Sequence, residues 1–249
     1  MDSNKKREAW AEAGSGQFAT THWSGVLLAG RKEAEGTNDA LGELCQTYWR
    51  PLYVFVRRRG HSMHDAQVLT QAFFENFLSR NYLADVSPDR GKFRTFLLAC
   101  MKHFLANEWK RAQRLKRGGG QTRVSLDFES AESSFQLESV DEANPEKLYD
   151  RRWALTLLGR ALDRQAAEYL ESGKADMFEA LKAFLTAREI RESYSKVGQR
   201  LGMTEGAVKV AVFRLRRRYR EILTEEIANT VLTPDMIDEE LQYFFSVLS

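Results

Sequence analysis

Two short amphipathic segments that meet at a glycine, within residues 194–218, limit the possible folds of this chain more than any other feature. The first covers residues 195–201 and ends at Gly202, which lacks a side chain and tolerates the left-handed conformation of a tight interhelical turn. Thr204 is suited to cap a second helix. The side of that helix facing the first would carry Val208, Val212 and Leu215. The pattern predicts a helix-turn-helix, whose second helix enters the major groove of DNA.

The outward face of the second helix holds the side chains that we expect to contact DNA. Arginines predominate after Leu215, and they suit phosphates better than bases. The expected contact residues are Thr204, Glu205, Ala207, Lys209, Val210, Arg214, Arg217 and Arg218. The alternative is a basic helical hairpin that binds no nucleic acid. We favour DNA binding because the glycine turn, the threonine cap and the one-sided basic cluster occur together.

Helical spacing extends through the rest of the chain, which contains only four prolines in 249 residues. Apolar residues recur at intervals of three and four, so we expect an all-α fold. The expected helices cover residues 39–59, 65–80, 92–116, 151–171 and 175–187, and the helix that begins after Thr204 continues to about residue 228. Thr20 is expected to open a further short helix, and Pro51 to kink or restart the first long one. Trp109 is either a core residue or a stacking platform, and we favour the core.

Opposed blocks of charge divide the chain, although its formal net charge is only +2. Residues 38–120 and 194–220 each carry a net charge of +7, whereas residues 121–150 carry −6 and residues 221–249 carry −7. The two basic blocks suit nucleic acid as a partner.

Three consecutive glycines at 118–120, followed by the acidic block, indicate a flexible linker between two small helical domains. We expect a lead-in at 1–37, a helical bundle at 38–116, the linker at 117–149, a helix-turn-helix domain at 150–222 and an acidic amphipathic extension at 223–249.

The sequence contains no pattern of a catalytic, metal or membrane protein. Cys45 and Cys100 lie in apolar helical patterns and favour buried thiols in a reducing compartment. His61 and His64 flank a turn without further metal ligands, and neither a phosphate-binding loop nor a nucleophile motif is present. A secretory signal and a membrane-spanning run are also missing. We therefore expect a cytoplasmic protein that is not an enzyme and needs no cofactor or metal.

Three stretches follow one another in a specific order: residues 52–74, which include the run Asp65-Ala66-Gln67-Val68-Leu69-Thr70-Gln71-Ala72-Phe73-Phe74, then residues 93–111, and then Leu201 to Lys209. With the linker between the second and the third, they resemble the extracytoplasmic function (ECF) group of the bacterial sigma-70 family of RNA polymerase sigma factors. The resemblance covers roughly residues 38–115 and 150–222. It implies that the first domain is similar to sigma region 2 and the second to region 4.

The resemblance implies a role for each surface. The helix at 65–80 would bind core RNA polymerase through Asp65, Gln67, Gln71, Phe74 and Glu75. Burial within the domain is the alternative for this helix, and we expect it for Phe73 and Phe77. The helix at 92–116 would meet the minus-10 promoter element and its unpaired strand through Lys102, His103, Asn107, Lys110, Arg111 and Arg114, unless these form an ordinary solvated face. The helix-turn-helix would bind the minus-35 element.

Some residues depart from the common pattern of that family. Val68 and Ala72 stand where acids are frequent, His103 and Asn107 replace residues that are usually Asn and Asp, and Ala211 stands where an Arg is frequent. These departures put the promoter sequence and the strength of core binding in doubt, but not the fold.

The function we expect is therefore that of a sigma factor, which binds core RNA polymerase and directs promoter recognition and transcription initiation. The alternative is a stand-alone helix-turn-helix regulator that does not bind the polymerase core. The expected partners are core polymerase and promoter DNA, and the resemblance also allows an anti-sigma factor or a kinase as a regulator.

The acidic extension at 223–249 has two interpretations. A helix restarts at Thr233-Pro234-Asp235, and it either completes a core or folds back to compete with DNA or polymerase. We favour the first.

Overall fold

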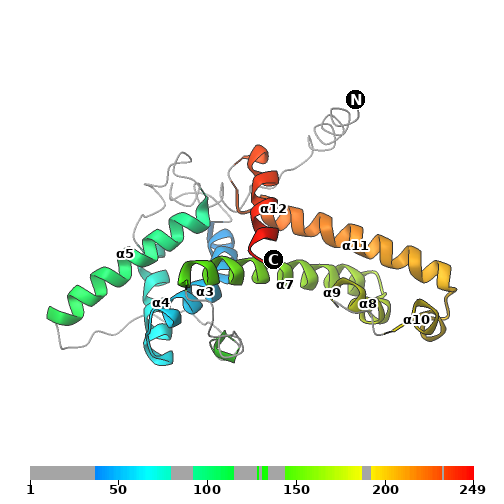
Figure 1. The fold of residues 1–249 in the computed structure, drawn as a ribbon, viewed down its shortest axis with the longest axis horizontal. Helices are drawn as coiled ribbons and strands as arrows, with labels where there is room; N and C mark the ends of the chain where they lie inside the picture. The colour runs from blue at the N-terminus through cyan, green and yellow to red at the C-terminus, as the bar shows by residue number, and fades with distance from the viewer. Residues whose placement is uncertain are drawn as a thin grey trace. The chain divides into compact units, whose positions relative to one another are not determined.

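A computed structural model describes residues 37–79, 92–114, 128, 131–133, 144–186, 192–231 and 233–249 (Figure 1). The described residues form helices and no strands, as expected for an all-α chain. No helix among them has the length and apolar character that crossing a membrane requires. The short helix expected after Thr20 lies outside the described residues. The described chain divides into two compact units, one comprising the residues up to Tyr149 with Ala228–Met236, the other Asp150–Ile227 with Ile237–Ser249.

The first unit is built on three long helices, α3 (Thr37–Arg58), α4 (Met63–Ser79) and α5 (Phe93–Arg114). Its core is rich in aromatic rings, with Phe73 in edge or stacked contact with Phe74, Phe77 and Phe104. The largest side chains buried there are Tyr53, Tyr149, Phe55, Phe74, Phe77, Leu52, Leu97, Met101 and Leu148. Phe73 and Phe77 are core residues, as predicted.

Helix α3 continues through Pro51, so of the predicted kink or restart at that residue the restart does not occur. A proline inside a helix removes one backbone hydrogen bond and costs about 3 kcal/mol. The flanking residues Tyr48, Trp49 and Leu52 to Val56 are all buried. Their burial stabilises one continuous helix despite the proline.

Both cysteines are free thiols, and burial raises the pKa of Cys45 to about 12 and that of Cys100 to about 11.

Part of the predicted linker packs on the first unit. Phe128 lies against Trp49 and Tyr53, with ring centroids 5.3 and 5.4 Å apart. Ala131 and Glu132 are buried, and the Glu132 carboxylate accepts hydrogen bonds from Tyr53 and Arg57. Within the predicted flexible linker, apolar and ionic contacts therefore hold Phe128 and Glu132 on the first unit.

The second unit contains most of α7 (Pro145–Glu171), and also α8 (Ala175–Leu181), α9 (Ala183–Thr186), α10 (Tyr194–Leu201) and α11 (Glu205–Ala228). Helix α7 begins six residues before the predicted Arg151. The Asn144 side chain accepts hydrogen bonds from the backbone N–H groups of Glu146 and Lys147, and Pro145 takes the first helical position. Asn followed by Pro is a favourable start for a helix.

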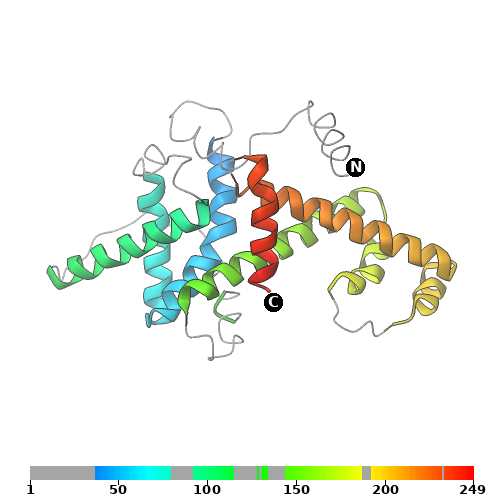
Figure 2. The same ribbon diagram turned by 45° about the horizontal axis from the view of Figure 1, so that its top comes forward.

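Helices α7 and α11 lie side by side in the second unit (Figures 1 and 2). Ion pairs join them at Arg160–Glu226 (2.9 Å), Arg164–Glu225 (2.5 Å) and Arg218–Glu168 (2.6 Å). The buried amide of Gln165 also donates to the carbonyl of Leu215, at 2.9 Å. These contacts set the position of α11 along α7.

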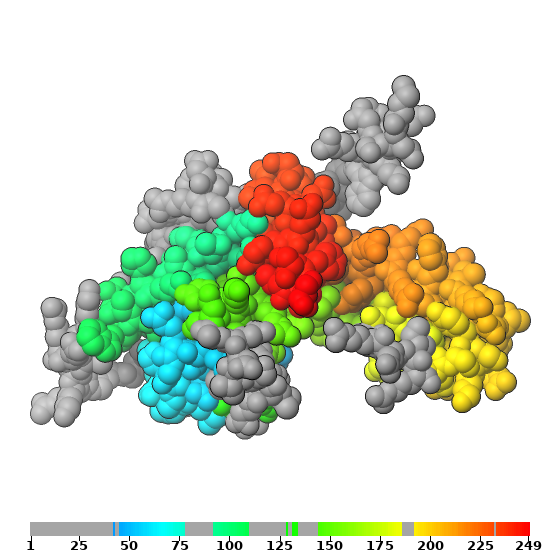
Figure 3. Space-filling model, in the orientation of Figure 1, coloured from blue at the N-terminus to red at the C-terminus, as the bar shows by residue number. Residues whose placement is uncertain are grey.

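The acidic extension ends in a short 3-10 turn, η2 (Pro234–Met236), and in α12 (Ile237–Ser246). Within the second unit, Phe244 of α12 packs edge-on against Trp153, with centroids 5.9 Å apart, and both are fully buried. The Tyr243 hydroxyl donates to Asp150 at 2.6 Å. The outer side of α12 belongs to the protein surface (Figure 3). The extension therefore completes a core, which is the interpretation that we favoured.

Candidate nucleic-acid interface

The turn between α10 and α11 has the predicted helix-turn-helix form. Helix α10 starts at the cap residue Ser193, whose side chain accepts a hydrogen bond from the backbone N–H of Lys196. It ends at Gly202, which adopts the left-handed conformation at φ 64° and ψ 32°. Val197 on α10 and Val208, Val212 and Leu215 on α11 are buried, as predicted. They belong to the apolar core that α8 and α9 complete with Phe178, Leu181 and Phe184.

The turn requires a second glycine, Gly198, which was not among the predicted turn residues. A β-carbon on Gly198 would lie 2.6 Å from the carbonyl oxygen of Met203, closer than such contacts occur. The same turn also places the backbone N–H of Met203 within hydrogen-bonding distance of the Gly198 carbonyl, at 2.9 Å. The signal in the sequence was a glycine four residues before Gly202, inside a helical pattern.

Several predicted contact residues are engaged within the protein. The Thr204 hydroxyl accepts a hydrogen bond from the backbone N–H of Ala207 at 3.2 Å, so its oxygen caps α11. Glu205 pairs with Lys209 at 2.7 Å, and this hydrogen bond raises the pKa of Lys209. The Lys209 ammonium also lies 5.8 Å from the centre of the Tyr194 ring.

The arginines of α11 fall into two groups. Arg218 donates to both carboxylate oxygens of Glu168, at 2.6 and 2.9 Å, and Arg216 donates to the carbonyl of Phe184. Arg218, predicted to contact DNA, is therefore part of the packing between α7 and α11. The hydrogen bonds with Glu168 raise the pKa of Arg218 above its ordinary value. Arg214 and Arg217 point outward, and Arg217 keeps 72% of its side chain exposed while pairing with Glu221.

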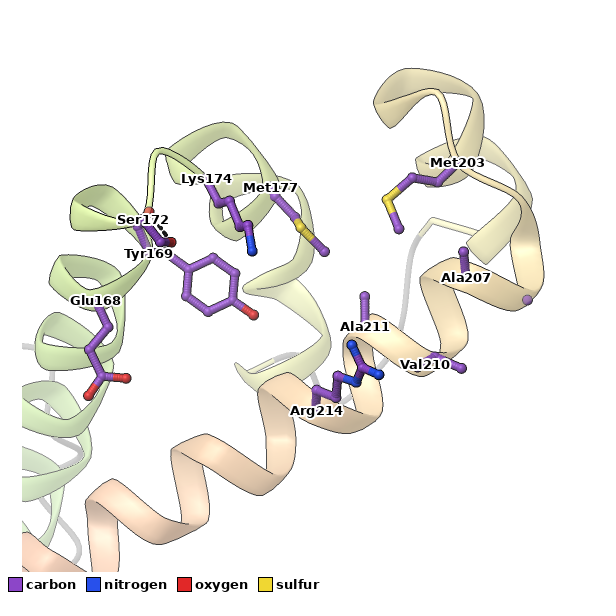
Figure 4. A pocket seen from close by; sticks show the side chains of 11 residues that line it. Glu168, Tyr169, Ser172, Lys174, Met177, Met203, Ala207, Val210, Ala211 and Arg214 are labelled. Carbon is purple, nitrogen blue, oxygen red and sulfur yellow. Dashed lines mark hydrogen bonds between the residues drawn. The ribbon is translucent and has the colours of Figure 1, made fainter.

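A pocket of about 560 Å³ opens beside the first turns of α11 (Figure 4). Gly206, Ala207, Val210 and Arg214 line it from α11, while Lys174, Met177 and Met203 lie on the opposite side (Figure 4). Ala211 forms part of its floor, so the small side chain at this position leaves the space open. Lys174 and Met177 were not among the predicted residues, because the sequence does not show that the start of α8 faces α11.

In the first unit, the predicted polymerase-binding residues of α4 differ in their exposure. Phe74 is completely buried, so it is a core residue and its assignment as a contact was wrong. Asp65 is exposed and accepts a hydrogen bond from Ser62, whose oxygen in turn caps the backbone N–H of Asp65. Gln67, Gln71 and Glu75 are half-buried. Met63 and Val68 add apolar surface to the same helix, each 48% exposed.

The predicted minus-10 residues lie on α5. His103 and Asn107 are exposed, whereas Lys102 pairs with Glu146 at 2.8 Å and lies near the face of Phe55. Lys102 lowers the pKa of Glu146. Lys110, Arg111 and Arg114 are on the last turns of the helix, and their side chains are outside the described part of the structure.

Trp109 corrects another expectation, because it is 65% exposed and does not lie in the core. Its neighbours on α5 at intervals of four, Leu105 and Met101, are buried, so the exposed ring stands at the point where the helix leaves the core.

No group of three His, Cys, Asp or Glu side chains suited to a metal ion occurs in the described ranges, and His61 and His64 are not joined by another ligand there.

Comparison with known proteins gives one match. The family model described as ECF sigma factor matches residues 31–209, a range that spans both helical units up to the first turn of α11. No curated protein and no solved structure matches the chain.

Proposed function

The chain belongs to the ECF sigma factor family and acts in transcription initiation, and we propose that it binds core RNA polymerase and directs it to promoter DNA. In this proposal residues 38–116 serve as region 2 and residues 150–222 as region 4. The observation that carries it is the helix-turn-helix, with Thr204 as the cap, an apolar inner side and outward-pointing Arg214 and Arg217.

Region 4 would bind the duplex minus-35 element with α11 in the major groove. Arg214 and Arg217 are placed for bases or phosphates, and Arg220 extends the exposed basic side. Arg218 is not assigned to DNA, because its guanidinium is bound to Glu168. Lys209 reaches DNA only if it leaves Glu205, so we assign it a secondary contact.

Region 2 would bind the minus-10 element along the exposed side of α5. His103 and Asn107 offer hydrogen-bonding groups, and the exposed ring of Trp109 offers a stacking face for an unpaired base. Lys110, Arg111 and Arg114 follow on the same helix and supply positive charge for the strand.

Core polymerase would bind the exposed side of α4. Asp65, Gln67, Gln71 and Glu75 supply polar groups, and Met63 and Val68 supply apolar surface. Exposed apolar side chains of this size mark protein interaction surfaces when they cluster. We infer that the contact between α4 and core polymerase is more apolar here than in family members that carry an acidic residue in place of Val68. An anti-sigma factor or a kinase is a further partner of this proposal.

Run-off transcription with purified core polymerase tests the proposal against the stand-alone regulator. We expect promoter-dependent transcript, and we expect the chain to co-purify with core polymerase. Val68→Lys should weaken core association while leaving duplex binding unchanged, and Arg214→Ala should do the reverse. Duplex binding without any core association would instead establish the regulator.

A further inference from the structure

The outermost face of the first three turns of α11 is apolar, which is unusual for a helix that enters DNA. Val210 is 51% exposed and Phe213 is 68% exposed. At 3.6 residues per turn, Gly206, Ala207, Phe213, Arg214 and Arg217 all lie within about 60° of Val210 around the helix axis. The buried row with Val208, Val212 and Leu215 is on the opposite side. Part of this face, at Gly206, Ala207 and Val210, also lines the pocket beside α11, while Phe213 lies outside that lining. The exposed apolar face of α11 is therefore open to a partner along Val210 and Phe213.

Polar side chains that normally read bases are scarce on this face. Thr204 is occupied as a cap, and Glu205 and Lys209 are paired with each other. Neither Asn nor Gln occurs between residues 203 and 220. Arg214 and Arg217 are the outward polar groups that remain on the face itself.

Gly206 leaves the backbone of α11 open on this face. A β-carbon at this position would meet no atom within 4 Å, and the backbone has no positive φ there. Packing therefore does not require glycine, although glycine weakens a helix relative to alanine. By contrast, Gly198 is required by the nearby Met203 carbonyl. A glycine at residue 206 would be favourable if a partner approaches the backbone of α11, because a side chain there would keep the partner at a greater distance.

Charge complementarity identifies the partner as DNA. Residues 194–220 carry a net charge of +7, and the arginines flank the apolar face and do not interrupt it before residue 214. In the major groove, the apolar group on a base edge is the C5 methyl of thymine, and alanine and phenylalanine side chains are known to contact it. We propose that region 4 of this protein selects its promoter element largely through thymine methyl groups, contacted by Val210 with Ala207 and Phe213 beside it. The inference rests on the proposed function of region 4 as a duplex reader.

Replacement of thymine by deoxyuridine tests the inference directly, because it removes the methyl group and leaves base pairing intact. Duplexes that bind the full chain are selected from a random library, and each thymine of the preferred site is then replaced singly. Burying one methyl group has a free energy that corresponds to about three- to fivefold in affinity. We expect losses of that size at one to three neighbouring thymines.

Two variants locate the contact. Val210→Ala should abolish the sensitivity to deoxyuridine at one of these positions, and Phe213→Ala at another. Both side chains are exposed, so truncation spares the core. Arg217→Ala is the matched control, since it should weaken all duplexes similarly, lower the salt dependence and keep the sensitivity to deoxyuridine.

The outcomes separate the two claims. Sequence-selective binding that is unaffected by deoxyuridine at every thymine overturns the methyl contacts and leaves the proposed function in place. Val210 and Phe213 variants with unchanged selectivity also overturn the methyl contacts. Failure of the full chain to bind any duplex, alone or with core polymerase, overturns the proposed function together with the inference.

Discussion

Glu132 holds the guanidinium of Arg57 through two hydrogen bonds, at 2.7 and 2.9 Å, although the two residues are 75 positions apart in the chain. The same carboxylate accepts a hydrogen bond from the Tyr53 hydroxyl at 2.5 Å. Both partners of the ion pair are largely buried, with side chains 18% and 9% exposed. An acidic residue that follows the glycine-rich break is thereby fixed to α3.

Replacing Glu132 by Gln should destabilise the first unit by about 2 kcal/mol, because Arg57 loses its counter-charge in a poorly solvated site. Urea unfolding measures the change. Glu179→Gln is the control, since its pair with Lys182 is solvent-exposed and should contribute less than about 0.5 kcal/mol. Equal effects of the two changes would show that residues 131–133 do not depend on this pair for their position.

Gly198 and Gly159 are both helical glycines, but they should respond oppositely to alanine. A β-carbon at residue 198 would collide with the Met203 carbonyl, whereas one at residue 159 meets nothing within 4 Å. We expect Gly198→Ala to destabilise the second unit by about 1–3 kcal/mol and Gly159→Ala to stabilise it by about 0.5–1 kcal/mol. Thermal unfolding of the two variants distinguishes them. A stable Gly198→Ala protein would mean that the turn can widen without loss.

Arg218 and Arg214 lie one helical turn apart and should have different roles. Arg218→Ala removes the contacts with Glu168, and we expect it to lower stability by about 1 kcal/mol, since the pair is partly solvated. Arg214→Ala should leave stability unchanged and weaken duplex binding. Denaturation and DNA titration of both variants provide the comparison. A normal stability for Arg218→Ala, with a large loss of DNA affinity, would return Arg218 to the DNA-binding surface.

The pair of Glu168 and Arg218 also predicts how stability depends on pH. Arg218 holds the pKa of Glu168 below its ordinary value of 4.5. A carboxylate with a lowered pKa in the folded state contributes stability that is complete above pH 4.5 and is lost as the pH falls through the lowered value. Unfolding of the wild type should therefore show a loss below pH 4.5 that is smaller in Glu168→Gln. Parallel pH profiles for the two proteins would contradict this assignment.

The sequence predicted the helices and the turn because their signals are local. Gly202 and Thr204 are only two positions apart, and the buried row on α11 follows from its helical period, so the helix-turn-helix required no knowledge of distant residues. Glu132 was missed because its partners, Tyr53 and Arg57, are far away in the chain. The pairing of Arg218 was missed for the same reason, since its identity shows a cation but not that Glu168 lies beside it.

The exposure of Trp109 was misjudged for a different reason: the apolar period of α5 continues past the point where its neighbours can cover it. The ring is 65% exposed, so Trp109→Ala should leave stability nearly unchanged. If Trp109 stacks on an unpaired base, its loss should reduce transcription from duplex promoters, because one such contact contributes about 1–3 kcal/mol. Trp109→Phe, which keeps a ring, should restore much of the activity. Templates with a pre-melted minus-10 segment should be affected less than duplex templates if stacking mainly drives strand opening. An equal defect of Trp109→Ala and Trp109→Phe, or an undiminished yield from both, would exclude the stacking role.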